Sequence, residues 1–175
     1  GDEEARRSEL TLAEHVRLLD DLAAAGSLWI CYTGGEVFAR TDFLDVYRAA
    51  RERGFVVTIF TNATLVTERV ADALAELPPF SIEVTLYGAT RAMYEALTGI
   101  PGSYDRCLRG IRLLLDRGLP LSLKTVAVTV NRHELGAMKE LAAELGLPFK
   151  WDAMMSPRVD CSRSPLEVRL SPEEI

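Results

Sequence analysis

One stretch of the sequence, residues 28–36, reads Leu28-Trp29-Ile30-Cys31-Tyr32-Thr33-Gly34-Gly35-Glu36. Its first five residues are apolar or aromatic, and a short apolar run of this kind that ends at a glycine turn is typical of a buried strand. A second apolar run, at residues 55–60, follows after one helical segment. The same alternation of strand and helix patterns continues to residue 153, which predicts an α/β fold.

The alternation predicts five strands and six helices. The expected strands cover residues 28–32, 55–60, 81–86, 121–129 and 148–153. The expected helices cover residues 11–25, 42–53, 67–77, 90–97, 103–117 and 132–145. Thr11 and Glu14 form a capping-box pattern at the start of the first helix. Consecutive strand–helix units assemble through right-handed crossovers, so we expect all five strands to be parallel in one sheet.

The polarity of the strands favours a barrel over an open sheet. In the segment 81–86, apolar residues at even positions alternate with polar residues at odd positions. In the segment 148–153, Lys150 and Asp152 alternate with aromatic residues. Central strands of a doubly wound sheet are usually apolar on both faces, whereas a barrel can carry polar ligand-binding groups in its lumen. We therefore expect a partial (β/α) barrel over residues 1–155 and an irregular C-terminal tail over residues 156–175.

Composition narrows the class of protein. The chain of 175 residues has a net charge of −6, which argues against broad electrostatic binding of nucleic acid. The sequence has neither an apolar run of about 18–20 residues, the length that a membrane helix needs, nor a signal-peptide pattern at its start. We expect a cytoplasmic protein that binds neither nucleic acid nor membrane.

The three cysteines, Cys31, Cys107 and Cys161, are far apart in the sequence. This spacing indicates neither a disulfide framework nor a local metal site, so we interpret them as structural thiols and assign no metal ligand.

The turn at residues 33–36 lies where a predicted strand ends. Ligands of parallel α/β folds bind at the carboxyl ends of the strands. Paired glycines let the backbone approach a ligand closely, and the Glu36 carboxylate can accept hydrogen bonds from an ammonium group. A simple solvated glycine turn is the alternative interpretation of these residues alone.

The segment 28–36 also resembles the second strand and GGE motif of radical S-adenosylmethionine (SAM) enzymes. Residues 60–63, Phe-Thr-Asn-Ala, resemble the TNG end of the next strand in that family, and residues 84–88 resemble its SLDG segment. Residues 98–104 and 131–135 are similar to segments of members that carry a SPASM-type auxiliary cluster domain. The resemblance covers roughly residues 8–172.

The resemblance implies a cofactor site. Gly34, Gly35 and Glu36 match the residues that hold the SAM amino group. Four further residues match positions that touch SAM in the molybdenum-cofactor-synthesis branch of the family: Thr61, Thr85, Lys124 and Met154. Lys124 would pair with the SAM carboxylate, although a surface lysine is the other interpretation, and Glu83 is an alternative contact to the ribose. No catalytic residue is assigned.

The sequence departs from the family pattern at several positions. Val37, Ala63 and Tyr87 replace the usual Pro, Gly and Asp, and we expect Ala63 and Tyr87 to reshape the substrate side of the pocket. The sequence also lacks the CxxxCxxC motif, whose thiolates bind the 4Fe–4S cluster. That loop would lie just upstream of residue 11. We therefore expect this chain to be an inactive fragment of a longer enzyme, with the loop missing from its N-terminal side and a further region following the tail.

The resemblance implies that the intact protein is an enzyme that reductively cleaves SAM at a 4Fe–4S cluster. The resulting 5′-deoxyadenosyl radical would abstract hydrogen from a peptide or a small molecule, with an electron donor as partner. Two alternatives stay open from the sequence. One is a barrel lyase that uses Lys124 to form a Schiff base, and the other is a degenerate, non-catalytic domain that binds a nucleotide or a protein.

Overall fold

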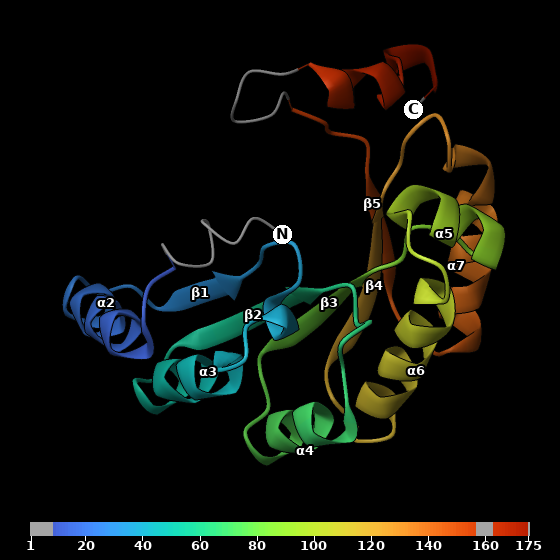
Figure 1. Cartoon of the computed structure of the whole chain (residues 1–175). Coiled ribbons are helices and arrows are strands. Elements are labelled where there is room, and N and C mark those ends of the chain that lie inside the picture. The colour runs from blue at the N-terminus through green and yellow to red at the C-terminus, as the bar shows by residue number, and fades with distance from the viewer. Residues whose placement is uncertain (1–8, 157–162, 175) are drawn as a thin grey trace.

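The computed structural model describes residues 9–156 and 163–174 and contains one five-stranded parallel sheet (Figure 1). The strands are β1 (Trp29–Tyr32), β2 (Val56–Thr61), β3 (Ser81–Thr85), β4 (Leu121–Val126) and β5 (Phe149–Asp152). Each strand is hydrogen-bonded in parallel to the next along the chain. The predicted α/β fold with five parallel strands is confirmed, and the strictly sequential strand order is that of a partial barrel.

Six α-helices of the described residues connect and cover the strands. They are α2 (Leu12–Ala24), α3 (Phe43–Glu52), α4 (Glu68–Glu76), α5 (Arg91–Thr98), α6 (Ser103–Leu115) and α7 (Leu135–Glu144). Figure 1 shows α2, α3, α4, α6 and α7 along the outer, convex side of the sheet. The predicted capping box is present, because Thr11 Oγ1 accepts a hydrogen bond from the Glu14 amide and the Glu14 carboxylate accepts one from the Thr11 amide.

Most expected elements differ from the observed ones by one or two residues at an end, and two neighbouring elements differ in a way that the structure explains. β4 ends at Val126 rather than at residue 129, and the helix expected from residue 132 begins with a 3-10 turn, η2 (Arg132–Glu134), before α7. The cause is Asn131, which is 1% exposed. Its Oδ1 accepts a hydrogen bond from the Val128 amide at 2.9 Å, and its Nδ2 donates to the Val126 carbonyl at 3.1 Å. The side chain thereby takes over backbone partners that a longer strand would use.

The described part of the C-terminal tail folds back toward β4. It contains two 3-10 turns, η3 (Ser164–Val168) and η4 (Pro172–Glu174), and Val128 forms an antiparallel bridge with Arg169. Leu170 is buried with 3% exposure. The tail residues that the structure describes are therefore anchored rather than extended away from the sheet.

The hydrophobic core lies between the sheet and its helices. Its fully buried members include Ile59, Ile82 and Leu123 from three adjacent strands and Leu114 from α6. Since successive side chains of a strand point to opposite faces, Thr58, Glu83 and Lys124, which alternate with the buried strand residues, lie on the concave face, away from these helices. The fold thus leaves a polar sheet face available for a ligand.

Candidate functional site

The glycine turn (residues 33–36) follows β1 at the carboxyl edge of the sheet. Thr33, Gly34 and Gly35 are exposed. Gly34 has φ of +153°, a backbone conformation that side chains disfavour, and an added Cβ at either glycine would meet no atom within 4 Å. The peptide groups of the turn are therefore open to a ligand.

Glu36 fastens the glycine turn to the end of β2. Its Oε1 accepts a hydrogen bond from Thr61 Oγ1 at 2.7 Å, and its Oε2 accepts one from the Asn62 amide at 2.8 Å. Oε1 also accepts a bond from the Phe38 amide at 3.2 Å, which caps η1 (Val37–Ala39). Thr61 is buried, with 4% exposure, and its hydroxyl proton is engaged by Glu36, so in this structure Thr61 supports the carboxylate.

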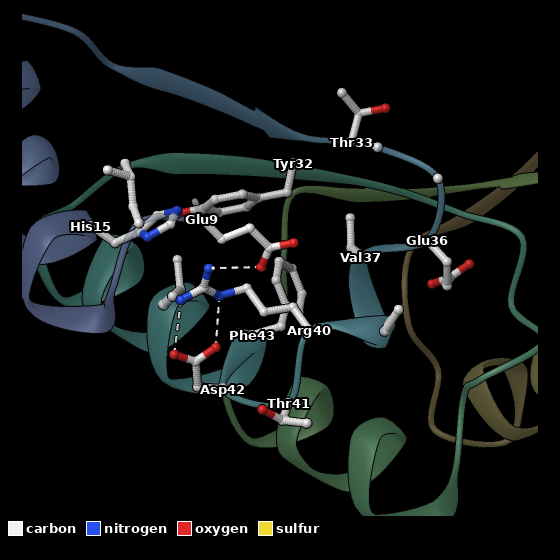
Figure 2. Close-up of a pocket in the computed structure, with 15 residues that line it drawn as sticks. Glu9, His15, Tyr32, Thr33, Glu36, Val37, Arg40, Thr41, Asp42 and Phe43 are labelled. Carbon is white, nitrogen blue, oxygen red and sulfur yellow. Dashed lines mark hydrogen bonds and ion pairs between the residues drawn. The ribbon is translucent and has the colours of Figure 1, made fainter. Parts of the chain in front are cut away.

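A cavity of about 800 Å³ lies beside the glycine turn, on the side of the sheet that faces the helices (Figure 2). Arg40 forms a two-pronged ion pair with Asp42, with Nε–Oδ1 and Nη2–Oδ2 distances of 2.6 and 2.9 Å, and approaches Glu9 at 3.5 Å. Burial raises the pKa of Tyr32, which also lines this cavity, to about 12. The sequence analysis did not identify Arg40, although the Arg-x-Asp spacing before α3 could have indicated its ion pair with Asp42. Figure 2 shows Glu36 lying apart from this ion pair.

A second cavity, of about 400 Å³, lies on the concave face at β3, β4 and β5 and is called the lysine cavity below. It is lined by Glu83, Thr85, Lys124, Thr125, Val126, Lys150, Trp151 and Asp152. Thr85 pairs in register with Lys124, which pairs with Lys150, so these three residues form one row across the strands.

The Glu83 carboxylate lies between two ammonium groups. Its Oε2 is 3.3 Å from Lys124 Nζ, and its Oε1 accepts a hydrogen bond from Lys150 Nζ. Lys124 Nζ also lies above the Phe60 ring, 2.8 Å from its centroid. The sequence analysis placed Lys150 on a polar strand face but gave it no role. Only the register between strands that are far apart in the sequence brings it to Glu83.

The two ion pairs change the proton affinities of the buried partners. Burial raises the pKa of Glu83, but hydrogen bonds from Lys150 and Lys124 outweigh this effect and bring the pKa below its ordinary value. Burial lowers the pKa of Lys124, and its hydrogen bond with Glu83 partly offsets that shift. The arrangement presents ammonium donors at the carboxyl ends of the strands.

Two further predicted residues, Thr85 and Met154, line different cavities. The Thr85 side chain has no hydrogen-bond partner among residues 9–156 and 163–174, so its hydroxyl is available. Met154 is 82% exposed just past β5 and lines a different cavity, with Trp151 and Leu170. Six of the predicted site residues therefore line three different cavities: the glycine turn lines one, Thr85 and Lys124 the second, and Met154 the third.

The expectation that Ala63 reshapes the substrate side is wrong. Ala63 is fully buried, and its φ of 58° lies in the left-handed region that favours glycine, which explains why the family usually has Gly there. Its carbonyl oxygen would lie 2.1 Å from a Cβ added to Gly110, so the residue contacts α6. Tyr87 does line a cavity, of about 300 Å³, together with Asn62 and Tyr94.

The described cysteines do not form a metal site. Cys31 is exposed, whereas Cys107 is buried and burial raises its pKa to about 12. Cys161 lies outside the described residues. Within the described ranges, no group of three or more His, Cys, Asp or Glu residues could hold a metal ion. These residues do not fit a 4Fe–4S cluster, whereas the open glycine turn, Thr85 and Lys124 offer donors that suit the amino-acid part of SAM.

Comparisons with known proteins agree with the sequence motifs. The sequence profile described as the Radical SAM superfamily matches residues 2–142. An AdoMet-dependent heme synthase of Methanosarcina barkeri is 30% identical over 138 residues, which are 79% of this chain and 40% of that protein. A PqqA peptide cyclase of Ruegeria pomeroyi is 32% identical over 138 residues, which are 79% of this chain and 37% of that protein.

The fold is also similar to solved structures. The structure titled "Native anSMEcpe with bound AdoMet and Cp18Cys peptide" aligns with a TM-score of 0.74 at 13% identity and covers 91% of this chain and 47% of that one. At this identity the likeness shows the fold. The chain spans at most 40% of the length of the two curated relatives described above. In the part of the chain that the structure describes, no helix has the length and apolar character needed to cross a membrane.

Proposed function

This chain belongs to the radical SAM superfamily, and from that premise we propose that the edge of its sheet at the carboxyl ends of the strands binds the amino-acid part of SAM. One observation carries the proposal. The open glycine turn after β1 and the Thr85–Lys124 row on β3 and β4 lie at the carboxyl ends of the same parallel sheet, where ligands of such folds bind.

Each residue has a distinct proposed role. Gly34 and Gly35 leave room for the SAM amino group beside their peptide groups, and the lone pairs that Glu36 retains accept hydrogen bonds from it. Lys124 pairs with the SAM carboxylate. Thr85 donates its hydroxyl proton to the same ligand.

Two further predicted residues act around that centre. Thr61 is a positioning residue, because its hydroxyl holds Glu36 in place. Met154 supplies an apolar contact from beyond β5, where it is exposed.

The proposed reaction is that of the intact protein. Enzymes of this family use SAM and a 4Fe–4S cluster, which supplies the electron for reductive cleavage of SAM and so the radical that abstracts hydrogen. We place the cluster ligands outside the described residues, which lack a suitable group. Because the sequence of this chain also lacks the CxxxCxxC motif, we expect the chain alone to be inactive.

A peptide is the proposed substrate. A relative named PqqA peptide cyclase and a structural neighbour solved with a bound peptide support this choice. Burial lowers the pKa of Lys124, which favours the neutral amine that a Schiff-base nucleophile needs, and the ion pair with Glu83 only partly offsets this shift. We favour the SAM carboxylate as the partner of Lys124 because the chain belongs to a family that uses SAM.

The test uses the longest natural protein that contains this chain, purified without oxygen and supplied with SAM and a strong reductant. We expect it to form 5′-deoxyadenosine, and Lys124→Gln to lower the rate at least about tenfold at subsaturating SAM, which corresponds to about 1.4 kcal/mol. Lys139→Gln is the matched control, because Lys139 is an exposed residue of α7 outside the lysine cavity. A full-length protein that loads a cluster but forms no 5′-deoxyadenosine would overturn the proposed reaction.

A further inference from the structure

The lysine cavity holds a second cation that the proposed SAM site does not use. We propose that Lys150 binds the carboxylate of an acidic side chain in the peptide substrate, next to SAM. The inference deepens the proposed function and rests on it. Its evidence is the placement of Lys150, Glu83 and Asp152 on one polar face.

Lysine is scarce in this sequence, and its placement is selective. Of 20 basic residues, only Lys124, Lys139 and Lys150 are lysines. Two of the three are register partners on adjacent strands of the concave face. A lysine ammonium is a compact charge with three donors, whereas a guanidinium is a wide planar fork. The lysine cavity therefore carries two compact cations side by side, an arrangement that needs anions to offset their repulsion.

Glu83 alone does not saturate these donors. Each ammonium has three N–H groups, and each directs one interaction to Glu83. The Lys124 side chain is 21% exposed and lies over the Phe60 ring, whereas the Lys150 side chain is 58% exposed. Lys150 is thus the cation that can turn a donor toward a second ligand while it keeps its bond to Glu83.

Asp152 sets the chemistry of that ligand. It lies two residues after Lys150 on the same strand face, and its Oδ1 accepts a hydrogen bond from the Met154 amide at 2.7 Å. The charged groups lining the cavity are two ammoniums and two carboxylates, so net charge gives a free anion little attraction. A ligand that fits carries a carboxylate for Lys150 and, nearby, an N–H donor for Asp152. An acidic residue within a peptide has both groups.

The test observes the three lysines directly. The chain is labelled with carbon-13 at the lysine ε-carbon only, so that Lys124, Lys139 and Lys150 give separate nuclear magnetic resonance signals, assigned from Lys150→Gln and Lys139→Gln. The probes are N-acetyl-glutamate N-methylamide and its glutamine counterpart, which has nearly the same shape and no charge. We expect the glutamate probe to shift the Lys150 signal in a saturable manner, with at least about fivefold tighter binding than the glutamine probe.

The variants separate specific binding from general charge. In the two Lys150 variants, which lack the Lys150 signal, binding is read from the Lys124 signal in the same cavity. Lys150→Gln should abolish preference for the glutamate probe, Lys150→Arg should keep part of it, and Lys139→Gln should leave it unchanged. Equal shifts from both probes, an equal shift of the Lys139 signal, or no shift of the Lys150 signal would each overturn the inference. Added SAM reports separately on the proposed function, because it should shift the Lys124 signal. A Lys150 response without a Lys124 response would leave the acidic-residue site standing and count against the SAM site.

Discussion

Replacing Glu36 with alanine should destabilise the fold, because this carboxylate joins the glycine turn to the end of β2. The substitution removes the acceptor of three hydrogen bonds, from Thr61 Oγ1 and from the amides of Asn62 and Phe38. Each bond contributes about 0.5–1.5 kcal/mol net, and water can reach part of the site, so we expect a loss of about 2–4 kcal/mol in the free energy of unfolding.

Urea unfolding followed by tryptophan fluorescence measures this loss, and a double-mutant cycle identifies its cause. Thr61→Val should cost about 1–3 kcal/mol, and Glu36→Ala with Thr61→Val should show a coupling energy of about 1 kcal/mol, since the two side chains share one bond. Glu140→Ala, at an exposed position of α7, serves as the control and should stay within about 0.5 kcal/mol of the wild type. A Glu36→Ala protein as stable as this control, or a coupling energy near zero, would refute the assigned connection.

Three other outcomes follow from particular contacts. Gly110→Ala should lower the free energy of unfolding in urea by at least about 2 kcal/mol, because the added Cβ would lie 2.1 Å from the Ala63 carbonyl oxygen. Gly136→Ala is the control and should not destabilise the chain, because its added Cβ would meet no atom within 4 Å. Equal effects of the two substitutions would contradict this packing. In the folded chain the pKa of Glu83 lies below its ordinary value of 4.5, so ionised Glu83 stabilises the fold above pH 4.5, and this stabilisation is lost as the pH falls through the folded-state pKa. The difference in unfolding free energy between the wild type and Glu83→Gln should therefore shrink in acid. A difference that does not change with pH would contradict the ion pairs. Anaerobic reconstitution with iron and sulfide should leave this chain without a stoichiometric 4Fe–4S cluster; a matching Mössbauer signature that disappears when its cysteines are replaced would show the opposite.

Local patterns were sufficient to predict most of the fold. Strand periodicity and the crossover rule predicted five parallel strands in one sheet, and the pattern of Thr11 and Glu14 predicted a capping box; the structure confirms both. The boundary errors near residue 126 arose because a side chain, Asn131, takes backbone partners, and periodicity does not reveal such bonds.

The connections within the candidate site were less accessible to sequence reasoning. Glu36 and Thr61 were each identified as ligand contacts, but their mutual hydrogen bond depends on how β1 and β2 align, and that alignment makes Thr61 a support. The bond between Glu83 and Lys150 likewise depends on the registers of two successive strand pairs. The sequence motifs were sufficient to place the candidate site at the carboxyl edge of the sheet. The hydrogen-bond and ion-pair partners of Glu36 and Glu83 became clear only from the assembled sheet.

Calorimetric titration of SAM into the longest natural protein that contains this chain, loaded with its cluster, tests the proposed site most directly. We predict that Lys124→Gln and Glu36→Ala each weaken SAM binding by about 1–3 kcal/mol, the scale for losing a hydrogen bond to a charged group, and that Lys139→Gln leaves it unchanged. Unaltered SAM affinity in a folded, cluster-loaded Lys124→Gln protein would contradict the placement of the SAM carboxylate at the lysine cavity.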